Sequence, residues 1–573
     1  MKHQAHSLCA VILLISLTGN LSAQYERLPG KEKQKLHQEI PSGSYSPNAF
    51  SNKKVSPAYK SANSGLLKTT GSNVFTTQVN IDGSGQNIIG DAANEPSIAV
   101  SPVNQNEIVI GWRQFDDVNS NFRQAGYAYS SDTGQTWTFP GVIEPGIFRS
   151  DPVLDVDANG QFYYNSLTNS PTFLCKVFRS NNGGATWDAG VDAAGGDKQW
   201  MTIDRTGGTG NGHIYSSWTQ NFSSCLPGFF TRSTDGGNSY ESCIEVDSNP
   251  YWLTMAVGVS GELILAGGHS LPDSIVVVKS TNANVAGSVI NWDSPVMVFM
   301  DGNLNGWTTV NPVGILGQVN VDVDRSGGPG QGNIYVLATL TRISNGDPGD
   351  VMFARSIDGG ITWSPPVRIN DDPSNFTTQW FGTMSVAPTG RIDAVWLDTR
   401  EDAFGLDSSA LYYSYSYDQG ITWSVNEKIS PLFDPHIGYP MQDKMGDYYD
   451  MVSDSAGAHL AWAATFNSEQ DVYYSYIVPP VITGVPESSS NAIANLYPDP
   501  AQSVINLKCN PSTRQVEIVN LLGETVIQKS NISRSSLLYN TLSIDINSLT
   551  SGVYFVKAIQ QDGSCGLKKF IKN

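Results

Sequence analysis

An eight-residue motif recurs five times along this 573-residue chain and constrains its fold more than any other feature. The copies are SSDTGQTW (130–137), SNNGGATW (180–187), STDGGNSY (233–240), SIDGGITW (356–363) and SYDQGITW (416–423). Each lies between two short segments of alternating character, which predicts a β-hairpin. The Asp or Asn side chain can accept backbone hydrogen bonds in the turn, the Gly can take a positive φ, and the aromatic residue can be buried. The motif therefore predicts one hairpin turn per structural unit, with a degenerate copy between Ser280 and Trp292.

A longer repeat contains this motif, because two strand-like segments precede each copy. Seven such pairs occur, at 95–112, 151–167, 199–218, 252–268, 318–338, 381–398 and 447–462. Aligned on their turns, they recur at intervals from 47 residues (157 to 204) to 67 residues (387 to 454). Four short strands at this period predict an all-β fold, a β-propeller with seven blades, or six as the alternative. The seventh copy lacks a fourth strand, and we expect TTQVNID (76–82) to supply it and close the ring.

The octapeptide resembles the Asp box, or BNR repeat, of the sialidase-like (neuraminidase) superfamily, over residues 76–477. The resemblance implies a secreted glycan-active protein, an exo-acting glycoside hydrolase of acidic sugars similar to exo-α-sialidases. Asp boxes also occur in non-catalytic proteins, so a cell-surface propeller that binds glycans or proteins is the alternative. The chain departs from sialidases, which have six blades and an F/Y-R-I-P motif; the nearest text here is GWRQF (111–115).

The ends of the chain indicate export. Residues 1–23 are expected to be a secretory signal peptide, and residues 24–75 a flexible polar leader before the propeller at 76–478. Residues 479–492 are rich in Pro and Ser and predict a linker.

The last segment, residues 493–573, is predicted to be a small β-sandwich. It resembles the C-terminal sorting domain of type IX secretion substrates through YPDP, LTSGVYFV and KKFIK. This implies the type IX secretion machinery as a partner, and a protein that is secreted or attached to the cell surface after crossing the outer membrane.

Charge and hydropathy exclude two further classes. The net charge of −19 argues against a nucleic-acid partner, because neutralising phosphates needs clustered Lys and Arg. No apolar stretch is long enough for a transmembrane segment. Five cysteines remain after the signal peptide, and Cys225 with Cys243, or Cys509 with Cys565, are candidate disulfides that the sequence does not prove.

Candidate functional residues follow from propeller topology, in which first strands begin, and second strands end, around one mouth. The predicted catalytic residues are Asp151 or Glu95 as proton donor, and Tyr448 with Asp447 beside it as nucleophile. The predicted substrate-binding residues are Arg113, Arg342 and Arg400, which could grip a carboxylate, together with Lys198, Trp252 and Trp380. The alternative is that these Arg and Asp side chains pair with one another and neutralise the channel wall.

The Asp-box aspartates belong on the opposite face and are expected to be structural. No metal site or cofactor is predicted. DVDANG (155–160) imitates the start of a calcium loop, but Ser166 stands where a bidentate Glu is needed. The histidines show no metal-ligand spacing, and neither a Cys-x-x-Cys pair nor a Gly-x-Ser-x-Gly elbow occurs.

Overall fold

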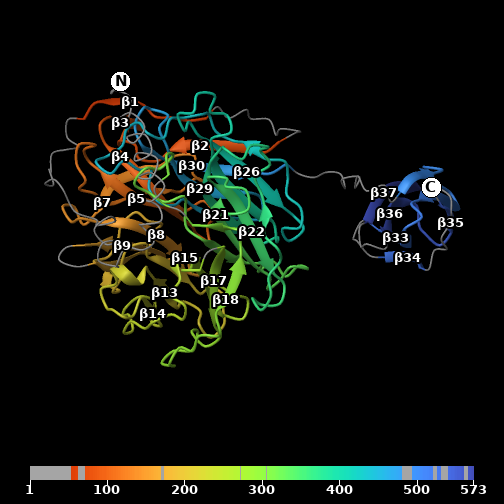
Figure 1. Cartoon of the computed structure of the whole chain (residues 1–573), viewed down its shortest axis with the longest axis horizontal. Helices are drawn as coiled ribbons and strands as arrows, with labels where there is room; N and C mark the ends of the chain where they lie inside the picture. The colour runs from red at the N-terminus through yellow and green to blue at the C-terminus, as the bar shows by residue number, and fades with distance from the viewer. Residues whose placement is uncertain are drawn as a thin grey trace, which may run out of the picture. The chain divides into compact units, whose positions relative to one another are not determined.

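The computed structural model describes residues 53–61, 71–169, 173–271, 273–304, 306, 308–480, 493–520, 525–530, 540–560 and 565–573. Contacts divide the chain into two units (Figure 1): the first ends at Pro479 and the second begins at Pro480. The expected signal peptide, much of the leader and most of the linker lie outside the described residues. Two parts of the expected leader are structured. One is β1 (Val55–Pro57), which pairs with β3 (Gln86–Ile88), and the other is the beginning of β2 (Asn73–Gln78).

Seven antiparallel sheets follow one another in the described part of the first unit. The first three sheets contain β4 (Ala92–Val100), β5 (Ile108–Phe115), β6 (Gln124–Ser130) and β7 (Thr138–Ile143); β8 (Ser150–Val156), β9 (Phe162–Thr168), β10 (Leu174–Ser180) and β11 (Val191–Asp192); and β12 (Trp200–Ile203), β13 (Ile214–Ser217) and β14 (Phe230–Ser233). The fourth and fifth contain β15 (Tyr251–Val257), β16 (Leu263–Gly268), β17 (Ser274–Ser280) and β18 (Val296–Phe299); and β20 (Asn320–Val323), β21 (Ile334–Arg342), β22 (Asp350–Ser356) and β23 (Val367–Arg368), with β19 (Gly302–Asn303) added to β21. The last two contain β24 (Gln379–Val386), β25 (Ile392–Asp398), β26 (Ala410–Ser416) and β27 (Glu427–Lys428); and β28 (Asp450–Ser453), β29 (Ala458–Ala464), β30 (Asp471–Val478) and β2.

The seven sheets form a closed ring, which is consistent with the blades of a propeller. The first strand of each sheet contacts the first strand of the next, from β4 through β8, β12, β15, β20 and β24 to β28, which contacts β4 again. As expected, an N-terminal strand completes the seventh sheet, because β2 pairs antiparallel with β30 from Asn73↔Val478 to Gln78↔Tyr473. The strand begins three residues earlier than expected (76 − 73).

The octapeptides form the expected turns after third strands, and in four of the five sheets that carry one a fourth strand follows among the described residues. In the first copy, Asp132 Oδ1 accepts from the Thr136 N–H at 2.9 Å and Oδ2 from the Thr136 hydroxyl at 2.6 Å. Ser130 donates its hydroxyl to Asp132 at 2.8 Å, and the Gly134 N–H donates to Ser130 at 2.9 Å. The degenerate copy keeps part of this pattern, since Asn282 accepts from the hydroxyl of Ser280 at 3.1 Å.

The third sheet departs from the repeat, with three described strands where four are expected. A disulfide joins Cys225, which follows the short 3-10 helix η1 (Gln220–Phe222), to Cys243. Ile244 beside it forms a bridge with Phe230 of β14, so the cross-linked segment lies where a fourth strand would pair. One of the two candidate disulfides is thus present.

Apolar residues of neighbouring sheets pack together and make the core. Trp112, Trp396 and Trp462 lie at equivalent places on second strands and are fully buried. Each indole N–H has a polar partner, as in the bond from Trp112 to Gln114 at 2.7 Å.

The second unit contains two antiparallel sheets around one apolar core. Their strands are β31 (Ile493–Tyr497), β32 (Val504–Cys509) and β35 (Asn540–Asp545); and β34 (Thr525–Ser530), β33 (Thr513–Val519), β36 (Gly552–Gln560) and β37 (Cys565–Lys572). Cys509 is a free, buried thiol, so the other candidate disulfide is absent.

Candidate functional site

One residue from each of the seven sheets lies at the start of its first strand, six positions before the aligned turn residue of the repeat (for example 101 − 95 and 157 − 151). These residues are Glu95, Asp151, Lys198, Trp252, Gln318, Phe381 and Tyr448. Five have a left-handed backbone, with φ of 49° at Glu95, 46° at Asp151, 58° at Lys198, 48° at Trp252 and 54° at Phe381. Non-glycine residues rarely adopt this conformation, and the surrounding structure must hold it in place.

The repeated backbone feature is a bulge in the first strand. Pairing in four sheets is interrupted at this point, as between Asn94 and Ser97 in the first sheet. One predicted residue is displaced by it: Trp380, expected at the mouth, is fully buried in the core and donates its indole N–H to Ser409 at 3.1 Å. The next residue, Phe381, takes the mouth position instead, so the prediction for Trp380 is wrong by one position.

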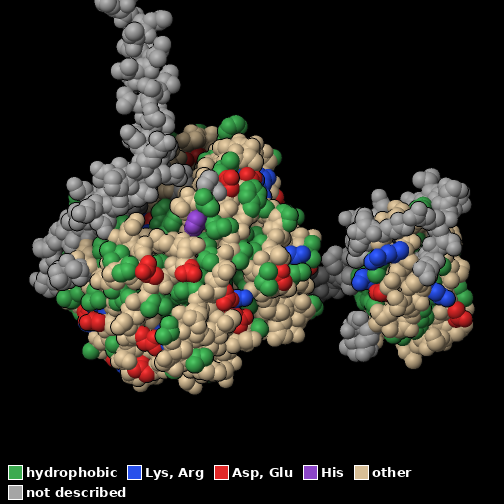
Figure 2. Space-filling model, turned by 60° about the horizontal axis from the view of Figure 1, so that its bottom comes forward, with side chains coloured by type: hydrophobic (Ala, Val, Ile, Leu, Met, Phe, Trp, Pro, Cys, Tyr) green, Lys and Arg blue, Asp and Glu red, His purple; other side chains and the backbone are tan. Residues whose placement is uncertain are grey.

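The mouth residues of the first three sheets belong to a buried cluster of opposite charges, which we call the charged cluster. Its carboxylates are Glu95, Asp151, Asp197 and Asp447, and its cations are Arg113, Arg123, Lys198 and Lys444; none is more than 5% exposed. On the face of the first unit that Figure 2 shows, acidic and basic side chains are scattered and do not gather into one cluster.

Asp447 is the centre of the cluster. Its Oδ2 lies 2.6 Å from Nζ of Lys198 and 2.5 Å from Nζ of Lys444. Lys198 also approaches Asp197 at 3.4 Å and Asp151 at 3.9 Å. Asp151 and Asp197 therefore share Lys198 with Asp447, which comes from a different sheet.

Glu95 makes the remaining connections. Its Oε2 lies 3.1 Å from Nε of Arg113, and its Oε1 lies 3.4 Å from Nζ of Lys444. The side chain of Glu95 also packs against the backbone of Gly446. Only a glycine allows this approach, because a Cβ at residue 446 would lie 2.5 Å from Cγ of Glu95. In the described part of the chain, Nη1 and Nη2 of Arg113 have no hydrogen-bond partner.

Burial and neighbouring charges divide the carboxylates into two kinds. Burial raises the pKa of Glu95 to about 8, although Arg113 and Lys444 act against it, and burial raises the pKa of Asp197 to about 6. Burial also opposes ionisation of Asp151, but Lys198 and Arg113 hold its pKa at about 2. Burial acts on Asp447 as well, yet Lys198 and Lys444 keep its pKa well below the usual range.

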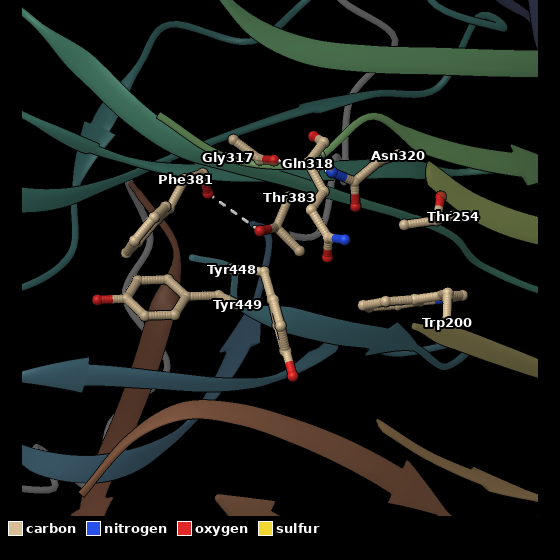
Figure 3. Close-up of a pocket in the computed structure, with 10 residues that line it drawn as sticks. Trp200, Thr254, Gly317, Gln318, Asn320, Phe381, Thr383, Tyr448 and Tyr449 are labelled. Carbon is tan, nitrogen blue, oxygen red and sulfur yellow. Dashed lines mark hydrogen bonds between the residues drawn. The ribbon is translucent and has the colours of Figure 1, made fainter. Parts of the chain in front are cut away.

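The other side of the ring's centre is uncharged. A narrow space of about 200 Å³ is lined there by residues that include Trp200, Gln318, Phe381 and Tyr448 (Figure 3). No position inside it accommodates a water-sized sphere. Neither amide atom of Gln318 has a hydrogen-bond partner among the described residues.

Tyr448, the predicted nucleophile, lies between these two regions. Its hydroxyl donates to the carbonyl oxygen of Pro152 at 2.7 Å, and its ring meets that of Trp200 edge to face at 5.6 Å. Burial, together with Glu95 and Asp151, raises its pKa well above the usual value. The phenol is therefore neutral and already bonded.

The three predicted arginines do not share one carboxylate in the structure. Arg113 belongs to the charged cluster, whereas Arg342 pairs with Asp301 and, at 2.7 Å, with Asp350. Arg400 pairs with Asp371 at 2.6 Å and with Asp398 at 2.8 Å, and its guanidinium lies 4.3 Å from the ring centre of Tyr412. Trp252 is partly exposed beside Tyr251. The catalytic and binding roles of all these residues stay predictions.

The sequence interpretation missed two cations of the cluster, Arg123 and Lys444. Both come from connections rather than first strands, so the repeat gave no position for them. Phe381 could have been found from the six-residue spacing alone.

The described residues contain neither a metal-binding cluster nor a membrane-spanning helix. No group of three or more His, Cys, Asp or Glu side chains there is placed to hold a metal ion. None of the helices described is long and apolar enough to cross a membrane.

Comparison with known proteins identifies the second unit. Residues 495–573 match the secretion system C-terminal sorting domain, and no curated protein sequence matches the chain. Distant structural matches include a protein of unknown function from Dyadobacter fermentans DSM 18053 (14% identity, 70% of this chain and 98% of that one, TM-score 0.40). Another is the polysaccharide lyase PL25 ulvan lyase (11% identity, 68% of this chain and 94% of that one, TM-score 0.41). A third is the NanB sialidase from Streptococcus pneumoniae (12% identity, 72% of this chain and 70% of that one, TM-score 0.34). The sorting domain indicates that the protein is secreted across the outer membrane.

Proposed function

We propose that the first unit is a seven-bladed Asp-box propeller that acts outside the cell as a non-catalytic module and binds a glycan or a protein. The observation that carries this proposal is the state of the predicted catalytic groups. Asp151 and Asp447 are fully desolvated and compensated by buried cations, and Glu95 is equally buried beside Arg113. Buried charges that are paired in this way are expected to be structural, and breaking the pairs is costly.

Access supports the same conclusion. A proton donor must come within hydrogen-bond reach of the leaving oxygen, roughly 2.6–3.2 Å. Ligand sites that enclose a molecule usually have a volume of about 300–1,000 Å³. The space beside Tyr448 does not accommodate even a water-sized sphere, so a sugar would have to displace the ring's own side chains.

An exo-acting glycoside hydrolase is the second candidate, and one observation favours it. The pKa of Glu95 is about 8 and that of Asp151 is about 2, so one carboxyl is protonated and another ionised near neutral pH. Such a division is what an acid and a base require. This function needs a conformation in which the two groups reach solvent.

The test is to incubate the mature protein with sialylated, uronic-acid and neutral glycans and to measure binding and sugar release separately. Binding without release supports the module. Release that is lost in Asp151→Asn and in Tyr448→Phe would establish the hydrolase and overturn the proposal. Arg400→Ala serves as the variant outside the charged cluster.

A further inference from the structure

A second cavity lies away from the ring's centre, between the outer strands of the sixth and seventh sheets. It has a volume of about 250 Å³, and its walls come from β2 and the residue before it, from β27 and the residues after it, from β29 and the residues after it, and from the segment that follows β1. This is the space open to the centres of water-sized spheres, and it is far above the ~10–15 Å³ of such space that one water molecule needs. No predicted site residue lines it.

One side of the cavity is aromatic. Tyr59, Trp462 and Phe466 line it, with ring centres 4.5 Å apart for Tyr59 and Phe466 and 5.7 Å apart for Trp462 and Phe466. Phe466 is also held from behind by Tyr473 at 5.0 Å. Rings packed in this way make a rigid apolar wall, which is a suitable surface for the C–H face of a sugar.

The opposite side is polar and already ordered. Glu427 Oε2 accepts from the Ser72 N–H at 2.6 Å, and Oε1 accepts from the Ser72 hydroxyl at 3.1 Å. Each carboxylate oxygen can accept a further bond, since an ionised carboxylate has about four acceptor positions. The half-buried hydroxyl of Tyr59 has no hydrogen-bond partner among the described residues. An acceptor and a free hydroxyl therefore line one cavity.

The charges at this cavity favour a neutral ligand. Lys428, its only lining cation, is paired with Glu401 at 2.5 Å, whereas Glu427 has no cationic partner among the described residues. A ligand carboxylate would meet the unneutralised Glu427, and it would gain no free cation.

We propose that this cavity binds one neutral sugar unit of a glycan, with the sugar's apolar face on Phe466 and Tyr59 and its hydroxyls on Glu427. The inference rests on the proposed binding function and gives that function a ligand class. Because β2 and β27 belong to different sheets, the ligand contacts both the sixth and the seventh sheet. Binding is therefore expected to raise the melting temperature, by an amount that grows with the logarithm of the ligand concentration.

The experiment measures binding of maltotriose, cellotriose, mannotriose and xylotriose to the mature protein by calorimetry, with sialyllactose as the charged probe. We expect a neutral trisaccharide to bind, and Glu427→Gln and Tyr59→Phe each to weaken binding by about 10-fold, the effect of one hydrogen bond to a ligand. Phe376→Leu is the matched control, because this aromatic side chain is 91% exposed and lies outside the cavity. The melting temperature of each variant, measured without sugar, separates lost binding from lost folding.

Two results would overturn the inference, and neither is the result that overturns the proposed function. If a trisaccharide binds equally to Glu427→Gln, Tyr59→Phe and the unmodified protein, the site lies elsewhere while the binding function stands. If only sialyllactose binds, the ligand class is wrong. The binding function itself fails if the glycans are cleaved.

Discussion

The Asp-box turns and the charged cluster both depend on carboxylates, but they stabilise them by different means. Asp358 in a turn is kept ionised by short-range hydrogen bonds: the hydroxyl and N–H of Thr362 and the hydroxyl of Ser356 lower its pKa to about 2. Asp447 in the cluster is buried, and the charges of Lys198 and Lys444 lower its pKa against that burial. A turn aspartate needs only its own eight residues, whereas a cluster aspartate needs residues from several sheets.

This difference explains which region repeats. Local hydrogen bonds can be copied with the sequence, so the turns of different sheets are nearly identical. Buried charges have to balance across the ring, and each sheet contributes a different group. The two regions are therefore expected to respond differently to mutation and to pH.

The largest effect is expected from Asp447→Ala. Removing this carboxylate leaves Lys198 and Lys444 buried without their nearest counter-charge, which should lower the free energy of unfolding by about 3–5 kcal/mol. Urea-induced unfolding followed by tryptophan fluorescence measures it. A loss below 1 kcal/mol would mean that the cluster is hydrated and not structural.

A pH dependence is expected next, from Glu95. Its folded pKa of about 8 is raised above the unfolded value of roughly 4.3, so the folded state holds the proton more tightly. Its contribution to stability is complete below the unfolded pKa and is lost as pH rises through the folded pKa. The slope is at most about 1.4 kcal/mol per pH unit between those values.

Glu95→Gln isolates this contribution because it keeps the shape and removes the titration. Relative to the unmodified protein, the variant should gain stability steadily from pH 5 to pH 8 and then reach a plateau. Denaturation curves at a series of pH values give the difference. A difference that does not change with pH would show that Glu95 is ionised in the folded protein.

A smaller effect is expected in the turns. Asp132→Ala removes the acceptor of the Thr136 N–H and hydroxyl, and it should cost about 1 kcal/mol, similar to the loss of a helix cap. The turn is partly exposed, so water replaces some of these bonds. The same urea experiment applies, and a loss as large as that of Asp447→Ala would remove the distinction between the two regions.

The smallest effect is expected from Asp132→Asn, below about 0.5 kcal/mol, within the range of ordinary surface substitutions. The turn of the second sheet already has Asn at the equivalent position. Asn182 Oδ1 accepts from the Thr186 N–H at 3.0 Å, and its amide donates to the Thr186 hydroxyl at 2.8 Å. Thermal unfolding is sensitive enough to detect it. A clear loss of stability would show that the turn needs a charge.

Much of the fold could be predicted because its signals are local and repeated. The octapeptides predicted the turns, the repeated pairs of strands predicted seven units, and the incomplete seventh copy predicted that an N-terminal strand closes the ring. The repeat also led to Glu95, Asp151, Lys198, Trp252 and Tyr448 at the mouth, whereas Trp380 was off by one because a bulge shifts the register of its strand.

The site was less predictable because its contacts cross the ring. Arg342 and Arg400 occupy equivalent positions at the ends of second strands, yet each pairs within its own neighbourhood. Lys444 and Arg123 enter from connections that have no counterpart in the repeat. Sequence spacing gives the position of a residue along a blade, but it does not give the distance between residues of different blades.

The pairing of β2 with β30 also determines when the fold can be completed. Its first partners, Asn73 and Val478, are separated by 405 residues (478 − 73), so one strand must wait for nearly the whole first unit to emerge. Until then β2 has no partner and exposes unpaired N–H and C=O groups, which can associate with other chains. Contacts this distant in sequence also slow folding. A chain that stops before residue 478 has no complete partner for β2 and leaves the seventh blade open.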